Sequence, residues 1–378
     1  MIHRYKNNGY NIVLDVNSGS VHVVDDIVYD IVGCLEEKMS EEAILEKFKN
    51  QYKEEDIRTA IEECRELEEA QMLFTNDIYE NAIESFKDRP TVVKALCLHI
   101  AHDCNLACRY CFAEEGEYHG RRALMTYEVG KQALDFLIAN SGNRRNLEVD
   151  FFGGEPLMNW NVVKELVAYG RSQEKIHNKH FRFTLTTNGV LLDDDIMEFA
   201  NKEMDNVVLS IDGRKEVHDF MRPFRKGKGS YDLVVPKFQK FADSRGQQKY
   251  YARGTFTHHN LDFSEDVLHL ADLGFEQISV EPVVADEKEE YAIKKEDIPK
   301  ICEEYDKLAK EMIRRNKEGK GFNFFHFMID LTGGPCVYKR LSGCGSGTEY
   351  LAVTPWGDLY PCHQFVGNED FLLGNVDT

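Results

Sequence analysis

The chain has 378 residues, of which 42% are hydrophobic and 30% charged, a composition typical of a globular protein with packed cores. Its formal net charge of −20 argues against a nucleic-acid backbone as a partner. No apolar run approaches the length of a membrane span, and the first residues do not resemble a secretory signal. We therefore expect a cytoplasmic protein without a membrane partner and without structural disulfides.

The N-terminal residues predict a small domain of their own. Residues 11–16 and 20–24 alternate polar and apolar side chains around an Asn-Ser-Gly turn, which predicts a β-hairpin. Helical patterns follow at 26–37, 40–50 and 54–70, with Ser40 as the N-cap of the second helix. A hairpin with three helices suggests a winged-helix module over residues 1–80.

Many winged-helix modules bind DNA, so the charge of this segment matters. Between Met1 and Ile78 there are 8 Lys and Arg against 18 Asp and Glu, a difference of −10, and such a surface repels phosphate. The segment is more similar to the PqqD-like domains that recognise leader peptides by adding the peptide as a strand to a free sheet edge. A linker around residues 81–89 leads to the next domain.

Three cysteines follow an apolar stretch at 92–100. Cys104, Cys108 and Cys111 have the spacing C-x3-C-x2-C. Thiolates are the ligands that iron–sulfur clusters use, and three of them hold three irons of a [4Fe–4S] cube. The fourth iron is then open to a small molecule. Tyr110 can pack over such a cluster and exclude water, which tunes its potential.

Two alternatives for these cysteines stay open. A structural zinc site needs a fourth ligand, which would have to be His102 or His119, and neither has the spacing of a zinc finger. The thiols could also be incidental core residues.

A second motif follows the strand predicted at 147–152. Gly153 and Gly154 let the backbone approach a ligand closely, and Pro156 presets the turn into a helix. Glu155 can accept hydrogen bonds from an ammonium group. The tetrapeptide alone would be a turn in most proteins.

Polar side chains end the next two predicted strands as well. Thr187 and Asn188 follow the strand at 181–186, and Ser210 and Asp212 end the strand at 206–210. Each pair could be an ordinary turn.

The strands are predicted near 94–100, 147–152, 181–186, 206–210, 249–256 and 277–281, alternating with helices near 126–140, 159–175, 192–202, 230–243 and 262–273. This alternation predicts a parallel sheet whose carboxyl ends carry the ligand groups.

A basic segment lies at 214–230 of this acidic chain. It contains Arg222, Arg225, Lys226 and Lys228. We expect either a solvated loop or a clamp on acidic groups of a substrate or cofactor.

The C-terminal part contains a mostly helical charged stretch at 286–320 and then a second group of cysteines. Cys344 and Cys362 frame a hairpin whose turn is at 355–358, and Cys336 is a candidate third ligand. A zinc ribbon or buried thiols are the alternatives. The remaining cysteines are expected in packed cores: Cys34, Cys64, Cys97 and Cys302.

The cysteine loop, the GGEP motif and the polar strand ends, in this order, resemble the radical S-adenosylmethionine (SAM) superfamily. The resemblance implies an α/β fold, an open partial (β/α)6 barrel over residues 90–285, with a catalytic [4Fe–4S] cluster on Cys104, Cys108 and Cys111. It also implies a set of SAM-binding residues: Tyr110, Gly153, Gly154, Glu155, Thr187, Asn188, Ser210, Asp212 and Arg222.

The spacing of Cys344, Gly357 and Cys362 resembles the opening of the SPASM extension, expected over residues 286–378. That resemblance implies an auxiliary [4Fe–4S] cluster with Cys336, Cys344 and Cys362 as ligands. The chain ends at Thr378, before the cysteine run that would hold a second auxiliary cluster. We expect either a truncated sequence or a shortened enzyme.

Over nearly its whole length the chain resembles the thioether-forming maturases of SCIFF peptides (six cysteines in forty-five). The resemblance implies a cysteine-rich precursor peptide whose leader binds the N-terminal domain, and a one-electron reductant such as flavodoxin or ferredoxin. A cysteine sulfur of that peptide would be joined to a carbon of an acceptor residue. The nearest alternative is an anaerobic sulfatase maturase, which forms formylglycine. An iron–sulfur sensor that regulates transcription is a more distant one, opposed by the GGEP motif and the acidic N-terminal segment.

Overall fold

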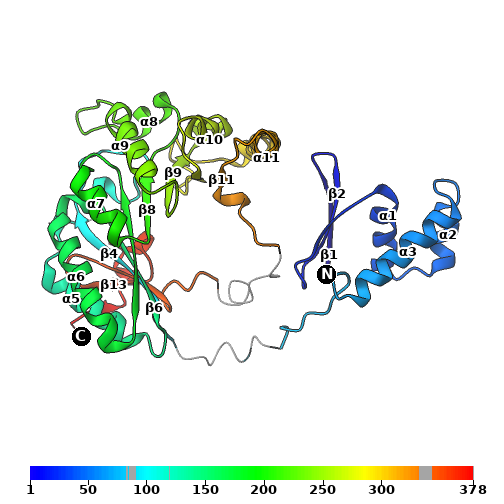
Figure 1. Cartoon of the computed structure of the whole chain (residues 1–378), viewed down its shortest axis with the longest axis horizontal. Coiled ribbons are helices and arrows are strands. Elements are labelled where there is room, and N and C mark those ends of the chain that lie inside the picture. Colours follow the sequence, from blue (N-terminus) through cyan, green and yellow to red (C-terminus); the bar gives the residue numbers. More distant parts are fainter. Residues whose placement is uncertain (82–83, 85–90, 119, 332–342, 378) are drawn as a thin grey trace. The chain divides into compact units, whose positions relative to one another are not determined.

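The computed structural model describes residues 1–81, 84, 91–118, 120–331 and 343–377 (Figure 1). Contacts divide the chain into two compact units, one made of residues 1–90 with 329–344 and the other of residues 91–328 with 345–378. Most of the linker predicted at 81–89, together with Cys336 and His119, lies outside the described residues.

The first unit contains an antiparallel sheet in the order β1 (Ile2–Asn7), β2 (Tyr10–Asp15), β3 (Val21–Val24). The hairpin of β2 and β3 was predicted, whereas β1 was missed. Most of its side chains are exposed, so it lacks a clear alternation of polar and apolar residues. Asn8 and Gly9 connect β1 to β2 with φ values of 51° and 82°, the geometry of a two-residue hairpin turn.

Three helices complete this unit, close to their predicted bounds: α1 (Asp26–Glu36), α2 (Glu41–Phe48) and α3 (Glu54–Glu69). The Ser40 hydroxyl caps α2 by accepting a hydrogen bond from the Ala43 amide at 3.3 Å, as predicted. Ile31, Ile44 and Ile57 are fully buried in the core of this unit.

The second unit is built on one large sheet. Its strands are β4 (Ala95–His102), β5 (Ala123–Leu124), β6 (Asn146–Gly153), β7 (His180–Thr187), β8 (Asn206–Ser210), β9 (Tyr250–Phe256), β10 (Gln277–Pro282), β11 (Asn323–Phe324), β12 (Tyr350–Val353), β13 (Asp358–Tyr360) and β14 (Gly374–Asn375). The order is β11-β10-β9-β8-β7-β6-β4-β12-β13-β14, with β5 paired to β4. Neighbours from β11 to β12 are parallel, so the six predicted strands form a parallel sheet as expected.

Helices connect these strands: α5 (Tyr127–Asn140), α6 (Trp160–His177), α7 (Asp194–Glu203), α8 (Lys215–Met221), α9 (Tyr231–Ser244), α10 (Phe263–Asp272) and α11 (Ile298–Lys317). All were predicted except α8, which occupies the first part of the basic segment predicted as a loop. The error has a physical cause, since a helix of seven residues is too short to show a clear apolar period. Among the described residues, no helix is long and apolar enough to cross a bilayer.

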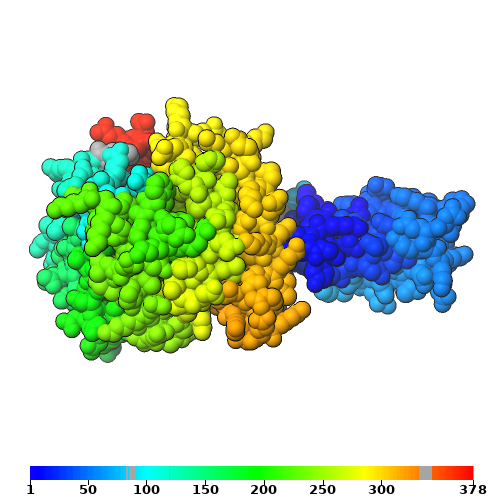
Figure 2. Space-filling model, turned by 90° about the horizontal axis from the view of Figure 1, so that it is seen from above, coloured from blue at the N-terminus to red at the C-terminus, as the bar shows by residue number. Residues whose placement is uncertain are grey.

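The two faces of β4 show how the unit is layered. Leu96 and Leu98 lie in the large core beneath the helices, whereas Cys97 belongs to a smaller cluster on the opposite face. β12 pairs in parallel with β4, so the predicted C-terminal hairpin extends the same sheet. At the surface, the red C-terminal residues accordingly lie beside the cyan segment that follows β4 (Figure 2).

Candidate active site

The loop after β4 places its three cysteines around one cavity. Cys104, Cys108 and Cys111 line a cavity of about 150 Å³ at the carboxyl end of the parallel sheet. The rest of the lining comes from this loop, from the ends of β6, β7 and β8, and from the segment after α8: Tyr110, Phe112, Phe152, Gly153, Gly154, Glu155, Pro156, Thr186, Thr187, Asn188, Ser210 and Arg222. Of the predicted cofactor-binding residues, only Asp212 is not part of the lining.

The two glycines are required by the cysteine loop itself. Gly153 has a φ of +118°, and a Cβ there would lie 2.4 Å from the Ala101 carbonyl oxygen. A Cβ on Gly154 would lie 2.1 Å from the Asp103 carbonyl oxygen. The sequence predicted that these glycines admit a ligand. In the structure the close neighbours are the end of β4 and the start of the cysteine loop, so the glycines allow the two motifs to pack together.

Glu155 is the buried centre of the site. It is 1% exposed, and its Oε1 accepts hydrogen bonds from the Leu157 amide at 3.0 Å and the Thr187 hydroxyl at 2.8 Å. Its Oε2 accepts one from the Asn188 amide at 2.7 Å. Burial raises the pKa of Glu155, and these hydrogen bonds oppose the rise. Since a carboxylate oxygen accepts two hydrogen bonds, Oε2 can take a further donor from a ligand.

Asp212 acts on the cavity through its neighbours. The Tyr110 hydroxyl lies 2.7 Å from Asp212 Oδ1 and 2.9 Å from Oδ2, and Arg222 Nη1 donates to the same hydroxyl at 2.7 Å. Arg222 also pairs with Asp212 at 3.9 Å. Within the described structure, the buried Nε of Arg222 has no hydrogen-bond partner. An unpaired buried donor in a cavity wall points to an anionic or polar ligand.

The basic segment divides into parts with different roles. Arg222 is in the cavity wall, and Arg225 donates to the Cys104 carbonyl at 2.7 Å and to Asp103 at 3.0 Å, which braces the cysteine loop. Lys226 and Lys228 are exposed. Of these four basic side chains only Arg222 lines the cavity, and a clamp on an acidic group stays a prediction for it.

The donor set fits an iron–sulfur cluster. Burial raises the pKa of Cys104 to about 12 and that of Cys108 to about 11, so a metal must displace their protons. Across the described part of the chain, no three His, Cys, Asp or Glu side chains lie close enough to hold one metal ion, which opposes a zinc site. A [4Fe–4S] cluster does not need this, because each of its cysteines binds a different iron. His102, the alternative zinc ligand, hydrogen-bonds His99 at 3.0 Å and stacks on Tyr118 instead of lining the cavity.

The sequence missed several residues that support the site. Asn188 Nδ2 donates to Asn105 Oδ1 at 2.7 Å, which links the end of β7 to the cysteine loop. The Tyr118 hydroxyl donates to the Gly153 carbonyl at 3.2 Å. His218 in α8 accepts at 3.3 Å from the Asp212 amide. No motif indicated the first two contacts, because each joins segments that are distant in sequence. The third was missed because His218 lies in the segment that was predicted as a loop.

The second group of cysteines is less complete. Cys336 lies outside the described residues, and Cys344 is exposed in the first unit. Cys362 follows β13 in the second unit, with its sulfur 3.9 Å from His363 Nδ1. Burial and then the charge of Arg253 lower the pKa of His363 to about 4. The assignment of these cysteines to one auxiliary cluster stays a prediction.

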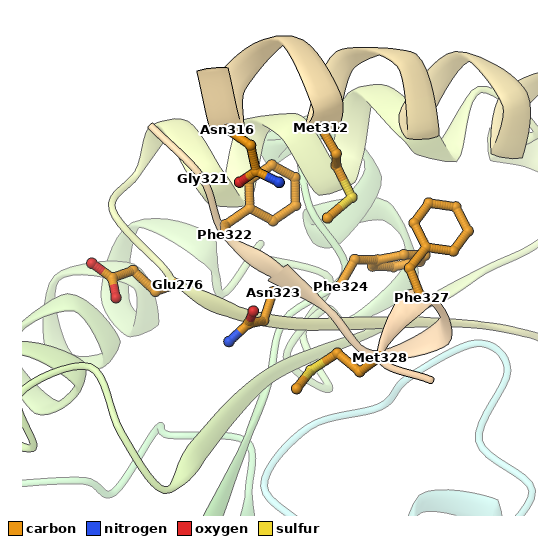
Figure 3. Close-up of a pocket in the computed structure, with 9 residues that line it drawn as sticks. All are labelled: Glu276, Met312, Asn316, Gly321, Phe322, Asn323, Phe324, Phe327 and Met328. Carbon is orange, nitrogen blue, oxygen red and sulfur yellow. The ribbon is translucent and has the colours of Figure 1, made fainter. Parts of the chain in front are cut away.

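A second cavity, of about 550 Å³, lies at the β11 edge of the sheet (Figure 3). Met312 from α11 and Phe322, Phe324 and Met328 from the β11 segment surround it. Glu276, Asn316 and Asn323 complete its lining, and none of the predicted site residues belongs to it.

Comparison with known proteins identifies the class. Residues 98–251 match the radical SAM superfamily. The chain is 30% identical over 287 residues to the uncharacterized protein MJ0907 of Methanocaldococcus jannaschii, covering 75% of this chain and 89% of that protein. The chain therefore belongs to the radical SAM superfamily.

More distant relatives include the antilisterial bacteriocin subtilosin biosynthesis protein AlbA of Bacillus subtilis. It is 24% identical over 282 residues, which are 73% of this chain and 56% of AlbA. The fold is shared with anSMEcpe bound to AdoMet, at a TM-score of 0.62 and 20% identity over 75% of this chain and 78% of that one. It is also shared with Streptococcus suis SuiB bound to its precursor peptide SuiA, at 0.57 and 14% identity over 100% and 85% of the two chains.

Proposed function

We propose that this protein is a radical SAM peptide maturase that joins a cysteine sulfur of a ribosomally made, cysteine-rich peptide to a carbon of an acceptor residue. The observation that carries the proposal is that Cys104, Cys108, Cys111, Glu155 and Arg222 line the same cavity. When bound there, a [4Fe–4S] cluster would supply the electron that cleaves SAM into methionine and a 5′-deoxyadenosyl radical.

The residues of the cavity bind and orient SAM in this proposal. Glu155 Oε2 accepts a hydrogen bond from the ammonium group of SAM, and Arg222, with its unpaired Nε, binds the carboxylate. Asp212 and Tyr110 hold the Arg222 side chain in place. The apolar rings of Phe112 and Phe152 exclude water from the reacting atoms.

The proposed modification balances in atoms and electrons. The acceptor carbon loses a hydrogen atom to the deoxyadenosyl radical, and the substrate thiol loses a proton. The carbon–sulfur bond then forms, and one electron leaves. An auxiliary cluster on Cys336, Cys344 and Cys362, or a protein of the flavodoxin or ferredoxin class, would accept that electron.

The N-terminal domain (residues 1–80), which makes up most of the first unit, is proposed to recognise a leader peptide. The catalytic barrel (90–285) and an auxiliary-cluster region (286–378) follow it in this proposal. In the sheet of the first unit, β3 has a strand partner on one side only among the described residues. Val21 and Val23 on β3 are 38% and 66% exposed. A free edge with exposed valines suits the addition of a peptide strand, and the binding of SuiB to its precursor peptide supports a peptide substrate.

The test is anaerobic reconstitution of the full chain with iron and sulfide, followed by reaction with SAM, a reductant and a cysteine-rich precursor peptide that includes its leader. We expect deoxyadenosine formation and a peptide product lighter by two hydrogens per cross-link, located by tandem mass spectrometry. Alkylation of the product should show one blocked thiol per cross-link. Failure to form deoxyadenosine, with or without peptide, would refute the proposed function.

A sulfatase-maturase-like activity is the second candidate, supported by the shared fold with anSMEcpe. It converts a Cys or Ser of its substrate to formylglycine and needs no leader-binding unit. Deletion of Met1–Ile78 separates the two, because unchanged turnover of the peptide would favour this alternative. Loss of turnover with deoxyadenosine formation intact would favour the leader-dependent maturase.

A further inference from the structure

Arg253 lies on the face of β9 that is turned toward the cysteine cavity. In the parallel pairing of β8 with β9, Arg253 is the register partner of Ser210, and in the pairing with β10 it is the partner of Ser279. Register partners point to the same face of a sheet. Since Ser210 lines the cysteine cavity, Arg253 stands one strand, about 4.8 Å, further along the same face.

The opposite face of β9 is closed by the core. Ala252 and Phe256 alternate with Arg253 and are fully buried in the large hydrophobic cluster beneath the helices. Arg253 itself is exposed. Its side chain therefore stands in the open space on the inner side of the sheet, outside the helical layer.

Among the residues that the structure describes, no hydrogen bond or ion pair holds the Arg253 guanidinium, although its charge acts on Glu281 and His363. The carboxylates on the same face are already engaged. Glu281 accepts from the Ser279 hydroxyl at 2.6 Å and contacts His326 at 2.7 Å, and Asp212 accepts from Tyr110. The Arg253 guanidinium therefore keeps its hydrogen-bond donors available to a ligand.

The charge of Arg253 nevertheless reaches the groups around this space. Burial acts to raise the pKa of Glu281, yet the hydrogen bonds from Ser279 and His326, with the charges of His326 and Arg253, leave it below its usual value. The charge of Arg253 therefore favours the ionised form of a carboxyl group in this space, as it does for Glu281.

We propose that Arg253 binds a carboxylate of the peptide substrate beside the cysteine cavity and so selects peptides with an acidic group near the modified residue. The inference rests on the proposed peptide substrate. Arg253 does not line the cavity that contains Glu155 and Arg222, so the carboxylate of SAM already has a separate partner. A guanidinium binds a carboxylate through two parallel hydrogen bonds, which gives both affinity and orientation.

The experiment measures the binding of four synthetic peptide pools to the anaerobically reconstituted full chain in the presence of SAM. Each pool has a central cysteine, randomised uncharged neighbours and a neutral fluorophore. Three pools are amidated at the C-terminus and carry Glu, Gln or Lys beside the cysteine. The fourth carries Gln and a free C-terminal carboxylate. Fluorescence anisotropy gives the Kd of each pool, and equilibrium dialysis gives the Kd of SAM.

We expect the wild type to bind the Glu pool, or the free-carboxylate pool, about tenfold more tightly than the amidated Gln pool, as for a partly solvated charge-assisted pair. The better of these two pools identifies a side-chain or a terminal carboxylate as the source. Arg253→Gln should remove the preference without changing the Kd of SAM. Arg253→Glu should reverse it in favour of the Lys pool, which a purely structural role of Arg253 would not do.

Arg144→Gln is the matched control, because Arg144 is also exposed but precedes β6, at the end of the sheet away from the cavity. It should leave all preferences unchanged. A preference that persists in Arg253→Gln, or equal or absent binding of all four pools by the wild type, would overturn the proposal. A tenfold weaker Kd for SAM in Arg253→Gln would overturn it as well and would assign Arg253 to SAM. Deoxyadenosine formation from SAM is measured for each variant as well. Its loss in the wild type would refute the proposed function, whereas a changed peptide preference alone concerns only Arg253.

Discussion

The two cysteine-bearing regions of the second unit are built in different ways. Around the cysteine loop, short hydrogen bonds join the ends of several strands to one carboxylate. Two buried donors of the described residues there have no partner, Asn105 Nδ2 and Arg222 Nε, and Arg222 lies in the cavity wall. Near Cys362, aromatic rings pack together, as His363 does on Phe152 and Phe112. The first arrangement fixes positions of individual atoms, whereas the second shields a space from water.

This difference extends to the buried imidazoles between the two regions. His99 and His102 are joined at 3.0 Å, and in the described structure His99 Nε2 and His102 Nδ1 have no partner although both rings are buried. Neither ring lines the cysteine cavity. Polar groups at the cavity are thus arranged toward a ligand, while those near Cys362 are enclosed by rings, a contrast that substitutions in each region can test.

The largest expected effect separates the two groups of cysteines. Cys108→Ala should remove iron from the proposed cluster and lower deoxyadenosine formation by more than about a thousandfold, because among the described residues only Cys104 and Cys111 would remain as thiols in this cavity. Cys362→Ala should keep deoxyadenosine formation and lose the cross-linked peptide. Iron content, electron paramagnetic resonance and product analysis by mass spectrometry check both outcomes.

Cys302→Ala is the control. Cys302 was predicted in a packed core, but this prediction was wrong, because the residue lies on the exposed side of α11. The substitution should leave the iron content and both products unchanged. Equal loss of deoxyadenosine in Cys108→Ala and Cys362→Ala would mean that the two regions do not have separate roles.

The next effect concerns the packing of the GGEP motif on the cysteine loop. Gly154→Ala places a Cβ 2.1 Å from the Asp103 carbonyl oxygen, and backbone atoms cannot yield as a flexible side chain does. We expect a loss of stability of about 3 kcal/mol, the upper range for overpacking, together with reduced iron incorporation. Gly120→Ala is the control, because its Cβ would have its nearest neighbour at 3.5 Å. Thermal unfolding and iron content of both variants measure the effect. Equal Tm values would show that the loop moves freely over the motif.

The sequence predicted much of the fold because its helices and strands have strong local patterns. The alternating strands and helices from β4 to β10 were found within a few residues, and the Ser40 cap was correct. β1 and α8 were missed, since one is largely exposed and the other is too short to show a period. These failures come from weak local signals and not from the tertiary arrangement.

The candidate site was predictable where residues stand in one motif and unpredictable where they meet across the sheet. Cys104 and Glu155 belong to motifs, and the structure brings both to one cavity. The hydrogen bond of Tyr118 to Gly153 and that of Asn105 to Asn188 depend on how the loop folds back, which no spacing encodes. Gly153 and Gly154 line the cavity, but their close packing on the backbone of Ala101 and Asp103 was not predicted, because those neighbours are distant in sequence.

The smallest expected effect is at Asp150 on β6, close to Cys97 and on the side of the sheet near Cys362. Asp150 is the register partner of Cys97 on β4, and burial raises its pKa from 3.8 to about 6, although a hydrogen bond from Thr184 opposes the rise. A carboxyl whose pKa is higher in the folded protein stabilises the fold most below its unfolded pKa. This contribution is lost as the pH rises through about 6.

Because Asn cannot ionise, Asp150→Asn should be more stable than the wild type at pH 8, by on the order of 2 kcal/mol, with the difference vanishing toward pH 4. Thermal unfolding at pH 4.5, 6 and 8 measures this, with Glu198→Gln on the exposed face of α7 as the control. If the stability gained by Asp150→Asn instead grew toward low pH, Asp150 would be ionised and paired in the folded protein. The surroundings of Cys97 and Cys362 would then be polar, like the cysteine cavity.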